Sequence, residues 1–499
     1  MSIIKRSAGL IRRHIWLLLV LAAGCALRVL MAIAYPHAFY FGDSRPYVYG
    51  AADNLPNPAR PYGYSFLLKP FVHAYAEYQP VALIQHGIGL ALIVAGYAFL
   101  VRRGVPGWGA ALAVLPIALD AREVTIEHYV VAETAYVALT VAALMLLAWR
   151  DRVGWVAASV SGLLLSLAAL TRTVGLPVIA LAGLYLLVRR VGWVRLGAFV
   201  LPVAVVLGGY MTWYHSTYRV YAFGQYQGRF LYGRVMSFAD CDKLELTPQQ
   251  RTLCMPDAPP SWRQKSDQYI WNHKSPAWLL YSDLSYDPFL GDFAKTVIKQ
   301  QPGDYLRTVA EGTAWHLMFR APLDKSAQCF SADRWVPPAQ PGRTCQALYF
   351  MPTAAPYKYT PPSPKTPNPM GQDLAAYGRL ATTPGPLYAL GIVLALVAAV
   401  WRCRRPGWRV AADALLFVGT GFGLIVVTVA TSIFDYRYSV PAALLVPLGI
   451  ALALHRIAAV RRRAMDPVPA QVGIADSITE QRDAEPVIDP VSARSGSVV

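Results

Sequence analysis

The sequence predicts an all-α polytopic membrane protein, a bundle of about ten transmembrane helices with a large extracytoplasmic segment that contains short helices and disulfides. Three observations predict this class. Hydrophobic residues make up 55% of the 499 residues and charged residues only 15%, unlike an average soluble domain. The apolar residues form blocks of about 15–22, enough for a helix to cross ~30 Å of hydrocarbon. Arginine clusters occur in every second loop between these blocks.

Ten apolar blocks are the predicted transmembrane helices. In chain order they are 15–35, 80–101, 105–119, 126–148, 153–170, 174–188, 193–214, 386–401, 410–432 and 438–456. The first block differs from a signal peptide because it is longer, contains Arg28 and lacks a small-x-small cleavage site before the next polar segment. We therefore interpret it as a membrane helix.

The arginine clusters orient these helices and explain the net charge of +17. With the N-terminus in the cytoplasm, nearly all clusters fall on the cytoplasmic side: Lys5, Arg6, Arg12 and Arg13; Arg102 and Arg103; Arg150 and Arg152; Arg189, Arg190 and Arg195; Arg402, Arg404, Arg405 and Arg409; and Arg456, Arg461, Arg462 and Arg463. This is the positive-inside pattern of multi-pass proteins of the plasma membrane. Because the basic residues lie at helix ends and not on one soluble face, the sequence predicts the lipid bilayer as a partner and no nucleic acid.

The same orientation divides the chain into four regions. Residues 1–214 form an N-terminal transmembrane core, whose first outward loop is 36–79. Residues 215–385 form an extracytoplasmic segment that is too polar to span the membrane and too long for a plain connection. Residues 386–463 carry the C-terminal transmembrane helices. Residues 464–499 have little apolar surface to bury, which predicts a disordered cytoplasmic tail.

The six cysteines agree with this topology. Four of them lie in the outward segment as two close pairs, and on the oxidising side such pairs predict disulfides. The pairs are Cys241 with Cys254 and Cys329 with Cys345. Zinc is the alternative, but no histidine has ligand spacing to these cysteines. Cys25 and Cys403 lie in or beside predicted helices, where we expect buried thiols.

Carboxylates and single arginines recur in the outward loops. Asp43 follows the first helix directly and has Tyr47 four residues later. The second outward loop carries Glu123 and leads to Glu133, at a helix mouth where a carboxylate is costly to bury without a partner or a task. Further candidates are Arg60 and Lys69 in the first loop, Arg172 at the end of the fifth helix, and Tyr436 and Arg437 in the last outward turn.

Four of these segments resemble the GT-C superfamily of lipid-carrier-dependent glycosyltransferases, which includes protein O-mannosyltransferases, lipid A aminoarabinose transferases and actinobacterial arabinosyltransferases. RPYGYSFLLKPF, after the first acidic residue, is similar to the PPxYPxLL segment of the family. VVAETAYVALTVAALML is similar to its second-loop acidic position, GLLLSLAALTRTVGLPV to its GLAxLTRP segment, and FDYRYSVPAALLVPLGI to its late RYxxPxxP element. The resemblance covers about residues 10–210 and 385–455. The acid pair common in the family's first loop is Asp43-Ser44 here, and the second-loop acid is a glutamate, which leaves metal dependence and the acid pairing open.

The resemblance implies a GT-C-type glycosyltransferase of the plasma membrane with an extracytoplasmic active site. Such an enzyme moves a sugar from a polyprenyl-phosphate donor to an envelope glycan, lipid or protein acceptor, by direct displacement with inversion. The chemistry needs a carboxylate base for the acceptor hydroxyl and fixed cations for the phosphate. We assign Asp43 and Glu133 as catalytic residues. The assigned substrate-binding residues are Tyr47, Arg60, Lys69, Glu123, Arg172, Tyr436 and Arg437. No cofactor is indicated, and the use of a divalent metal stays open.

Each assignment has a structural alternative. Asp43 has good N-cap chemistry for a short helix, and Glu133 also suits a cap or a snorkelling side chain. Arg172 and Arg437 also suit pairing with carboxylates or with bulk lipid phosphates. The tyrosine-rich stretches suit an interfacial belt better than a sugar platform. No metal site is predicted from the histidines, which look scattered: His73, His86 and His128.

Two other functions stay open. A transporter or flippase of lipid-linked sugars also carries rare charges among its helices, but the internal repeats and broken helix pairs typical of transporters are not evident. A lipid-linked glycan ligase or polymerase also has a large late outward loop, but the Asp43 loop and the ALTRT element fit GT-C enzymes better. The chain has 36 arginines against 10 lysines, which suggests a GC-rich bacterium. An actinobacterial envelope glycan, with arabinofuranose or mannose as the sugar, is therefore the favoured target.

Overall fold

The computed structural model describes residues 2–40, 42–72, 78–264, 266–319, 369–401, 408–432 and 434–465. The chain divides into two compact units, Met1–Ile457 and Ala458–Val499. The first unit contains every helix from α1 to α21 and most of α22. Four predictions fall outside the described residues: the disorder of the tail, the Cys329–Cys345 disulfide, the buried thiol of Cys403 and the role of His73.

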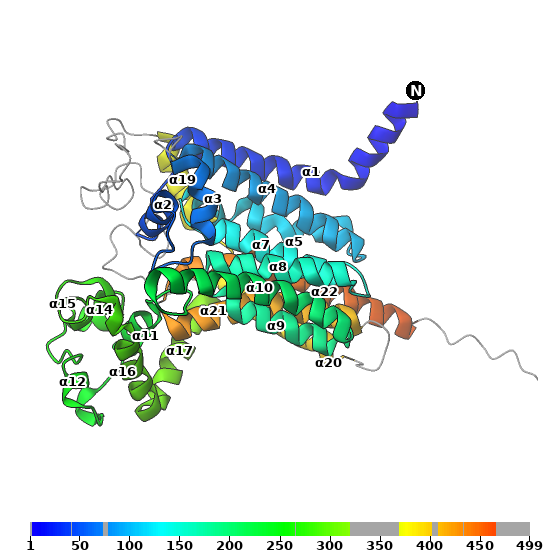
Figure 1. Cartoon of the computed structure of the whole chain (residues 1–499). Helices are drawn as coiled ribbons and strands as arrows, with labels where there is room; N and C mark the ends of the chain where they lie inside the picture. Colours follow the sequence, from blue (N-terminus) through cyan, green and yellow to red (C-terminus); the bar gives the residue numbers. More distant parts are fainter. Residues whose placement is uncertain are drawn as a thin grey trace, which may run out of the picture. The chain divides into compact units, whose positions relative to one another are not determined.

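Ten long helices coincide with the ten predicted apolar blocks (Figure 1). They are α1 (Ser2–Ala34), α4 (Gln79–Arg102), α5 (Gly107–Leu119), α7 (Glu133–Ala148), α8 (Trp155–Thr171), α9 (Gly175–Val188), α10 (Trp193–Tyr218), α20 (Gly385–Val400), α21 (Trp408–Thr431) and α22 (Val440–Met465). α8 packs against α7, α9 and α10, α4 packs against α5 and α7, and α21 contacts α20 and α9. The described residues contain no strand, only an isolated bridge between Phe39 and Tyr129. The all-α prediction is therefore confirmed for this part of the chain.

The predicted number of ten membrane spans is not confirmed. Five described helices are long and apolar enough to cross a membrane, or six if α19 (Pro369–Leu380) and α20, which are bent by 41°, form one span. α5, α7, α8 and α9 are apolar but have only 13 to 17 residues. At ~1.5 Å per residue such helices rise only about 20–26 Å, which is less than ~30 Å of hydrocarbon.

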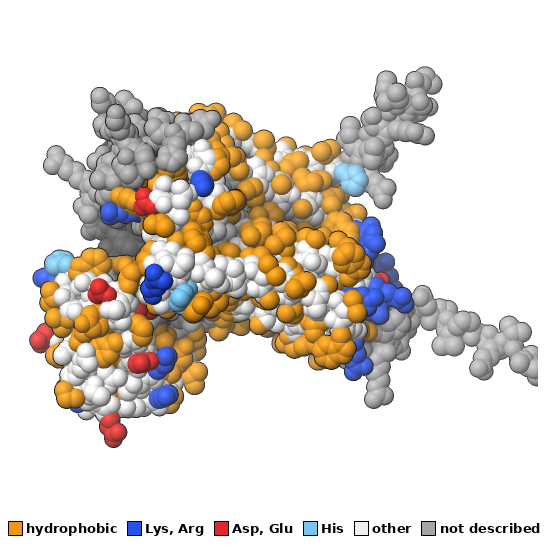
Figure 2. Space-filling view, in the orientation of Figure 1, with side chains coloured by type: hydrophobic (Ala, Val, Ile, Leu, Met, Phe, Trp, Pro, Cys, Tyr) orange, Lys and Arg blue, Asp and Glu red, His pale blue; other side chains and the backbone are white. Residues whose placement is uncertain are grey.

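The flanks of the bundle are apolar, as a lipid-facing surface requires. Figure 2 shows hydrophobic side chains along the helices and basic side chains gathered at one end. Leu184, Leu187, Leu201 and Val205 on α9 and α10 are each about half exposed or more. Close helix contacts depend on small residues, since a Cβ on Gly162 of α8 would lie 2.2 Å from the backbone oxygen of Phe199 on α10.

The segment after α10 folds into short helices with an apolar core of their own, as predicted. These helices are α11 (Gln227–Val235), η1 (Cys241–Lys243), α12 (Pro248–Arg251), α13 (Pro260–Gln264), α14 (Gln268–Trp271), α15 (Pro276–Leu279), η2 (Leu284–Tyr286), α16 (Asp287–Gln300) and α17 (Pro302–Leu317). α11 packs along α16 and also contacts α21, and α17 contacts α20 and α21. The segment is therefore anchored on the bundle.

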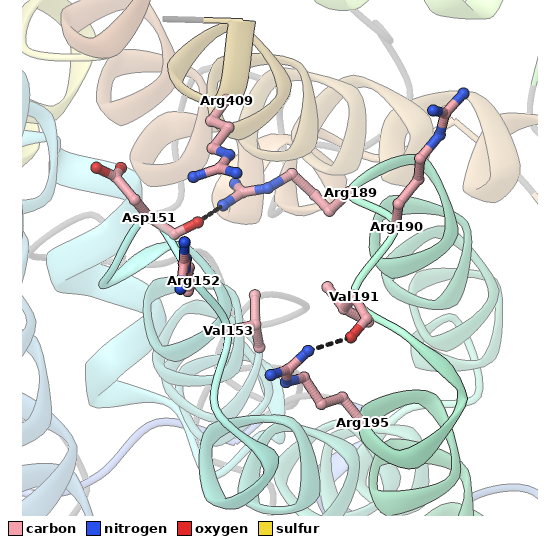
Figure 3. A pocket seen from close by; sticks show the side chains of 8 residues that line it. All are labelled: Asp151, Arg152, Val153, Arg189, Arg190, Val191, Arg195 and Arg409. Atoms are coloured by element: carbon pink, nitrogen blue, oxygen red, sulfur yellow. Dashed lines mark hydrogen bonds between the residues drawn. The ribbon is translucent and has the colours of Figure 1, made fainter. Parts of the chain in front are cut away.

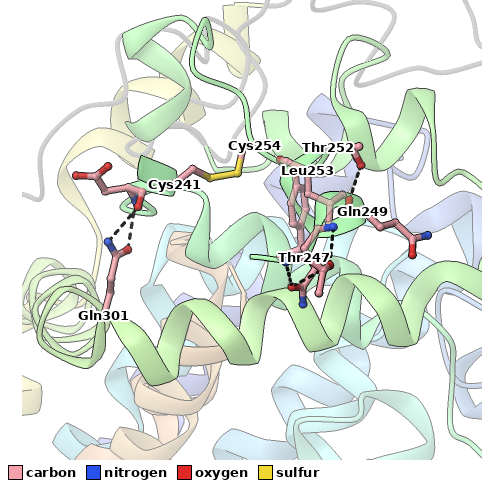
Figure 4. The surroundings of a disulfide bond; sticks show 10 residues. Cys241, Thr247, Gln249, Thr252, Leu253, Cys254 and Gln301 are labelled. Carbon is pink, nitrogen blue, oxygen red and sulfur yellow. Dashed lines mark hydrogen bonds between the residues drawn. A yellow bond between two sulfur atoms is a disulfide. The ribbon is translucent and has the colours of Figure 1, made fainter. Parts of the chain in front are cut away.

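A disulfide closes one turn of this segment. Cys241 and Cys254 are bonded, which confirms the first predicted pair (Figure 4). Between them, Thr247 and Gln250 form a capping box at the start of α12. Cys25, by contrast, is a free and exposed thiol, so the prediction of a buried thiol was wrong. The buried face of α1 carries Leu27, Arg28 and Met31, and Cys25 lies on the exposed side of that helix.

Three short helices and one 3-10 turn lie in the loops at one end of the bundle. They are α2 (Ser44–Asp53), α3 (Gly63–Val72), α6 (Ala121–His128) and η3 (Tyr436–Ser439). α2 packs on α3, and α3 packs on α8. A Cβ on Gly63 would lie 2.5 Å from the backbone oxygen of Leu170, so only glycine lets the first loop come this close to the end of α8.

Candidate active site

Six charged side chains meet where these loops converge. Three are carboxylates and three are arginines: Asp43, Glu133 and Asp435, and Arg60, Arg172 and Arg437. Most of them stand at the ends of helices, because helix ends are where the chain turns back at this end of the bundle. The cluster spans the chain, since Asp43 and its partner Arg437 are 394 residues apart.

Asp43 is held between two arginines. Its Oδ1 accepts a hydrogen bond from Arg60 Nη2 at 2.6 Å, and its Oδ2 accepts one from Arg437 Nη1 at 2.8 Å. Asp43 occupies the N-cap position of α2, yet its side chain makes no capping hydrogen bond to that helix. The geometry therefore favours a role in the charged cluster over the alternative of a helix cap.

Glu133 forms the other side of the cluster. It is the first residue of α7, its side chain pairs with Arg172, and its Oε1 lies 3.6 Å from Arg437 Nη1. Glu133 is only 3% exposed, and its Oε2 has no hydrogen-bond partner among the described residues. A buried carboxylate oxygen without a donor is costly, so it is a natural contact point for a ligand hydroxyl.

Asp435 completes the cluster and is not among the predicted site residues. Its Oδ2 lies 2.9 Å from Arg437 Nε, and its Oδ1 accepts a hydrogen bond from the backbone N–H of Arg437 at 3.0 Å. Asp435 thus caps the η3 turn and orients the arginine at the same time. The signal that could have found it is its position two residues before Arg437 in the same outward turn.

The environment shifts the pKa values of Asp43 and Asp435 in opposite directions. Burial by itself raises the pKa of Asp43, but the charges of Arg60, Arg437 and Arg172 outweigh it and hold the pKa well below its usual range. Burial raises the pKa of Asp435, and the attraction of Arg437 offsets this only in part. Asp43 is therefore firmly ionised here, whereas Asp435 takes up a proton more readily.

Aromatic side chains surround the cluster. Tyr47 is buried in α2 beside the charges, in edge-to-face contact with Tyr64 at 5.0 Å between ring centroids. Tyr438 lies under two guanidinium groups, with the Cζ of Arg437 5.5 Å and that of Arg172 6.0 Å from its ring centroid. Buried rings are not interfacial anchors, so these two tyrosines belong to the site and not to a lipid-facing belt.

Other predicted site residues lie apart from the six charges. Tyr436 belongs to an aromatic group with Phe434, at 4.9 Å between ring centroids. Lys69 is exposed on α3 and forms no ion pair with a described residue. Arg60 does belong to the cluster, and its Cζ also lies 5.2 Å from the ring centroid of Phe230 in α11. The outer segment thus contributes the ring of Phe230 beside the charges.

Glu123 belongs to a second polar group next to the first. It lies with Asp120, Arg122 and Ser439 around a very small space. Burial, together with the charges of Asp120 and Glu127, raises the pKa of Glu123 well above its usual value. Arg122 reaches Ser439 Oγ at 3.4 Å, so the η3 turn connects the two groups.

A third group corrects the prediction that the histidines are scattered. Arg28 of α1 pairs with Glu127 at 2.6 Å, Glu127 contacts His86 Nδ1 at 2.8 Å, and His86 Nε2 lies 3.0 Å from His128 Nδ1. The described residues contain no group of histidine, cysteine or carboxylate side chains suited to a metal ion. The lone arginine within the first apolar block was the signal for this buried network, because such a charge needs a partner.

Comparisons with known proteins add one likeness. No protein-family model matches the sequence, and no curated protein matches it. The chain is similar to a solved structure described as the crystal structure of ArnT from Cupriavidus metallidurans bound to undecaprenyl phosphate. The match covers 90% of this chain and 79% of that chain, at 15% sequence identity and a TM-score of 0.34. At so low an identity and TM-score, this likeness carries no argument, and the proposed function rests on the geometry of the site and on the sequence motifs.

Proposed function

We propose that this protein is a membrane glycosyltransferase that moves a sugar from a polyprenyl-phosphate donor to an envelope glycan, lipid or protein acceptor. One observation carries the proposal. Three arginines that can bind a phosphate lie within one cluster with carboxylates that can take a proton, at the ends of apolar helices. Both functions are needed when a hydroxyl displaces a lipid phosphate, and the phosphate of a lipid carrier lies at the depth of helix ends.

The arginines are the proposed phosphate site. Guanidinium groups match phosphate oxygens with two parallel hydrogen bonds, and fixed cations stabilise the charge that develops on a departing phosphate. In the absence of donor, carboxylates satisfy Arg172 and Arg437. We therefore propose that donor binding exchanges the partners of these two arginines: phosphate oxygens replace the carboxylate oxygens around them.

The exchange also explains how Asp43 becomes a base. As long as Arg60 and Arg437 hold it, its low pKa makes it a weak proton acceptor. When the donor phosphate draws Arg437 away, one of the arginine charges that lower the pKa of Asp43 is removed, and the pKa rises towards the ordinary value of ~3.9. Asp43 then takes the acceptor proton while the acceptor oxygen bonds to the anomeric carbon. The carbon–phosphate oxygen bond breaks, and the electron pair leaves with the lipid phosphate. This displacement needs no protein nucleophile and inverts the anomeric centre.

The proposal is tested by transfer assays with purified protein. The protein is incubated with a panel of radiolabelled polyprenyl-phosphate sugars, including arabinofuranosyl and mannosyl donors, together with envelope acceptors. We expect transfer that depends on Asp43 but not on Asp53, an exposed aspartate ten residues further along the same loop. Release of free lipid phosphate with inversion supports the proposal. Donor movement across vesicles without bond cleavage would instead identify a transporter, and transfer of preassembled glycans a ligase.

The proposed orientation is tested by cysteine labelling in intact cells. An impermeant thiol reagent should label Asp53→Cys in the first outward loop and should not label Ser477→Cys in the C-terminal tail. The parent protein measures the labelling of native cysteines such as the exposed Cys25. Labelling of the tail from outside, or protection of position 53, would contradict the orientation.

A further inference from the structure

A pocket lined by arginines lies at the opposite ends of the helices that carry the charged cluster. It has a volume of about 220 Å³ and is formed by the α7–α8 loop, the α9–α10 loop and the start of α21. α8 separates the two places, since Arg172 follows its last residue and Val153 lies just before its first. A helix of 17 residues spans about 25 Å, so the pocket is a separate site.

The pocket has a large excess of positive charge. Its lining contains five arginines and one aspartate: Arg152, Arg189, Arg190, Arg195, Arg409 and Asp151 (Figure 3). Arg103 stands behind it, paired with Asp151 at 3.0 Å and with Asp413 at 2.8 Å. Among the described residues, six arginines therefore face only two carboxylates, and this part of the chain leaves most of the positive charge unpaired.

The floor of the pocket is a rigid, buried network. Arg189, whose side chain is 2% exposed, pairs with Asp413 at 2.6 Å and donates to the backbone oxygen of Asp151 at 2.6 Å. Tyr185 donates to the same Asp413 carboxylate at 2.6 Å. This network ties α9, α21 and the α7–α8 loop together, so the geometry of the pocket does not depend on a ligand.

The remaining arginines are available for a ligand. Arg152 and Arg409 make no ion pair or side-chain hydrogen bond with any described residue, and both are exposed. Figure 3 shows their guanidinium groups near Arg189 and Asp151, with Arg195 across the opening, where it donates to the backbone oxygen of Val191. A rigid arginine flanked by two unpaired ones suits the several oxygens of a phosphate group.

From these observations we infer that the pocket binds a phosphate-bearing anion, with the headgroup of an anionic phospholipid as the source favoured by its position at the helix ends. The pocket volume of about 220 Å³ is below the ~300–1,000 Å³ of pockets for drug-sized ligands, so the pocket suits a small group such as a lipid headgroup. Basic pockets between membrane helices on the cytoplasmic side, where the charge pattern places this end, are a known mode of lipid recognition. This inference is independent of the proposed glycosyltransfer.

Native mass spectrometry of the purified full-length protein tests the inference. The protein is titrated with phosphatidylglycerol and with phosphatidylcholine, whose phosphate is neutralised within its own headgroup, and separately with inorganic pyrophosphate. Three variants are compared with the parent: Arg152→Gln, Arg409→Gln and Arg102→Gln. Arg102 is an exposed arginine at the same end of the bundle that does not line the pocket, so it measures unspecific attraction to the membrane surface.

We expect tighter retention of phosphatidylglycerol than of phosphatidylcholine. Retention should weaken about tenfold or more in Arg152→Gln and in Arg409→Gln but not in Arg102→Gln. If pyrophosphate binds in place of lipid, and its binding depends on Arg152 and Arg409 but not on Arg102, the site belongs to a soluble phosphate compound. If neither ligand binds, or if all three variants lose binding equally, the inference is overturned. Thermal unfolding of each variant verifies that the fold is retained.

Discussion

The two ends of the helix bundle use arginine in different ways. At the end with Asp43, three arginines meet three carboxylates, and every one of these arginines has an anionic partner within the protein. At the other end, six arginines meet two aspartates, and Arg152 and Arg409 have no partner among the described residues. The first group, with equal numbers of positive and negative side chains, is called here the balanced cluster, and the second, with excess positive charge, the unbalanced pocket. An anion can bind to the balanced cluster only if it replaces a carboxylate beside an arginine. In the unbalanced pocket it can bind to arginines that have no carboxylate partner.

The balanced cluster depends most on Asp43. Asp43→Asn keeps the size and most hydrogen bonds of the side chain but removes its basicity, so turnover should fall by roughly 10²-fold or more. Donor affinity should hold or increase, because Asp43 no longer competes for Arg437. Turnover and donor binding are measured by transfer and equilibrium-binding assays, with Asp53→Asn as the matched control.

Two further variants locate the base among the three carboxylates. Glu133→Gln and Asp435→Asn are measured alongside Asp43→Asn, since Asp435 takes up a proton more readily. If either of them alone abolishes turnover while Asp43→Asn transfers sugar at the parent rate, the base has been misassigned.

The arginines of the balanced cluster should control donor affinity. Arg172→Ala or Arg437→Ala removes a charge-assisted contact worth roughly 1.5–3 kcal/mol, so donor should bind about 10- to 100-fold more weakly. Lysine at either position should restore only part of the affinity, since a point charge cannot reproduce the fork of a guanidinium.

Removing Arg172 also takes the closest partner from the buried Glu133, which keeps only the more distant Arg437 at 3.6 Å. The double variant Arg172→Ala/Glu133→Gln separates this stability effect from the loss of the phosphate contact. Arg45→Ala, which changes an exposed arginine of α2 in the first outward loop, is the control for net charge. If Arg172→Ala and Arg437→Ala both bind donor as tightly as the parent protein, the proposal that phosphate replaces carboxylate at these arginines is ruled out.

The stability of the balanced cluster should depend on pH. The pKa of Asp43 is lowered in the folded protein, so its ion pairs contribute stability that is fully present above the unfolded value of ~3.9 and is lost as the pH falls through the folded value. The difference in unfolding temperature between the parent and Asp43→Asn should be full at pH 6–7 and should shrink below about pH 4.

The stability effect of Asp435 should change with pH in the opposite direction to that of Asp43. The pKa of Asp435 is raised, so protonation favours the folded protein, and Asp435→Asn should cost least stability near neutral pH and more in acid. Thermal unfolding of both variants and the parent at pH 7, 5, 4 and 3 measures the two trends. Parallel pH profiles for the two variants would mean that Arg437 does not distinguish the two carboxylates.

Substitutions in the unbalanced pocket should change the stability of the fold least. Arg152→Gln and Arg409→Gln relieve repulsion among like charges and break no ion pair between described residues, so unfolding free energy should stay within about 0.5 kcal/mol of the parent or rise slightly. Arg437→Gln, which leaves Asp435 without its arginine partner and takes one of the two arginines from Asp43, should unfold at a clearly lower temperature in the same measurement. A marked loss of stability in Arg152→Gln would show that this arginine is structural.

The sequence alone determined the positions of the long helices and most residues of the charged cluster. Helix length and apolar periodicity are local properties, so all ten apolar blocks could be located from residue order. Glu133 was predicted as a site residue because a carboxylate at a helix mouth is costly without a partner or a task, and Asp43, Arg172 and Arg437 because of their places in the outward loops and the resemblance to GT-C enzymes. The Cys241–Cys254 pair followed from spacing and from the predicted side of the membrane.

Only the tertiary structure decided how these charges pair. Ion pairs depend on distances between residues that are far apart in the chain, such as Asp43 with Arg437 or Arg189 with Asp413, and no local pattern encodes those distances. The same holds for the contact between His86 and His128, which sequence order made look unrelated. The opposite shifts of Asp43 and Asp435 and the excess charge of the arginine pocket have the same physical cause. Each depends on which opposite charges the fold brings within a few ångströms, because electrostatic energy falls with distance and is largest where water is excluded.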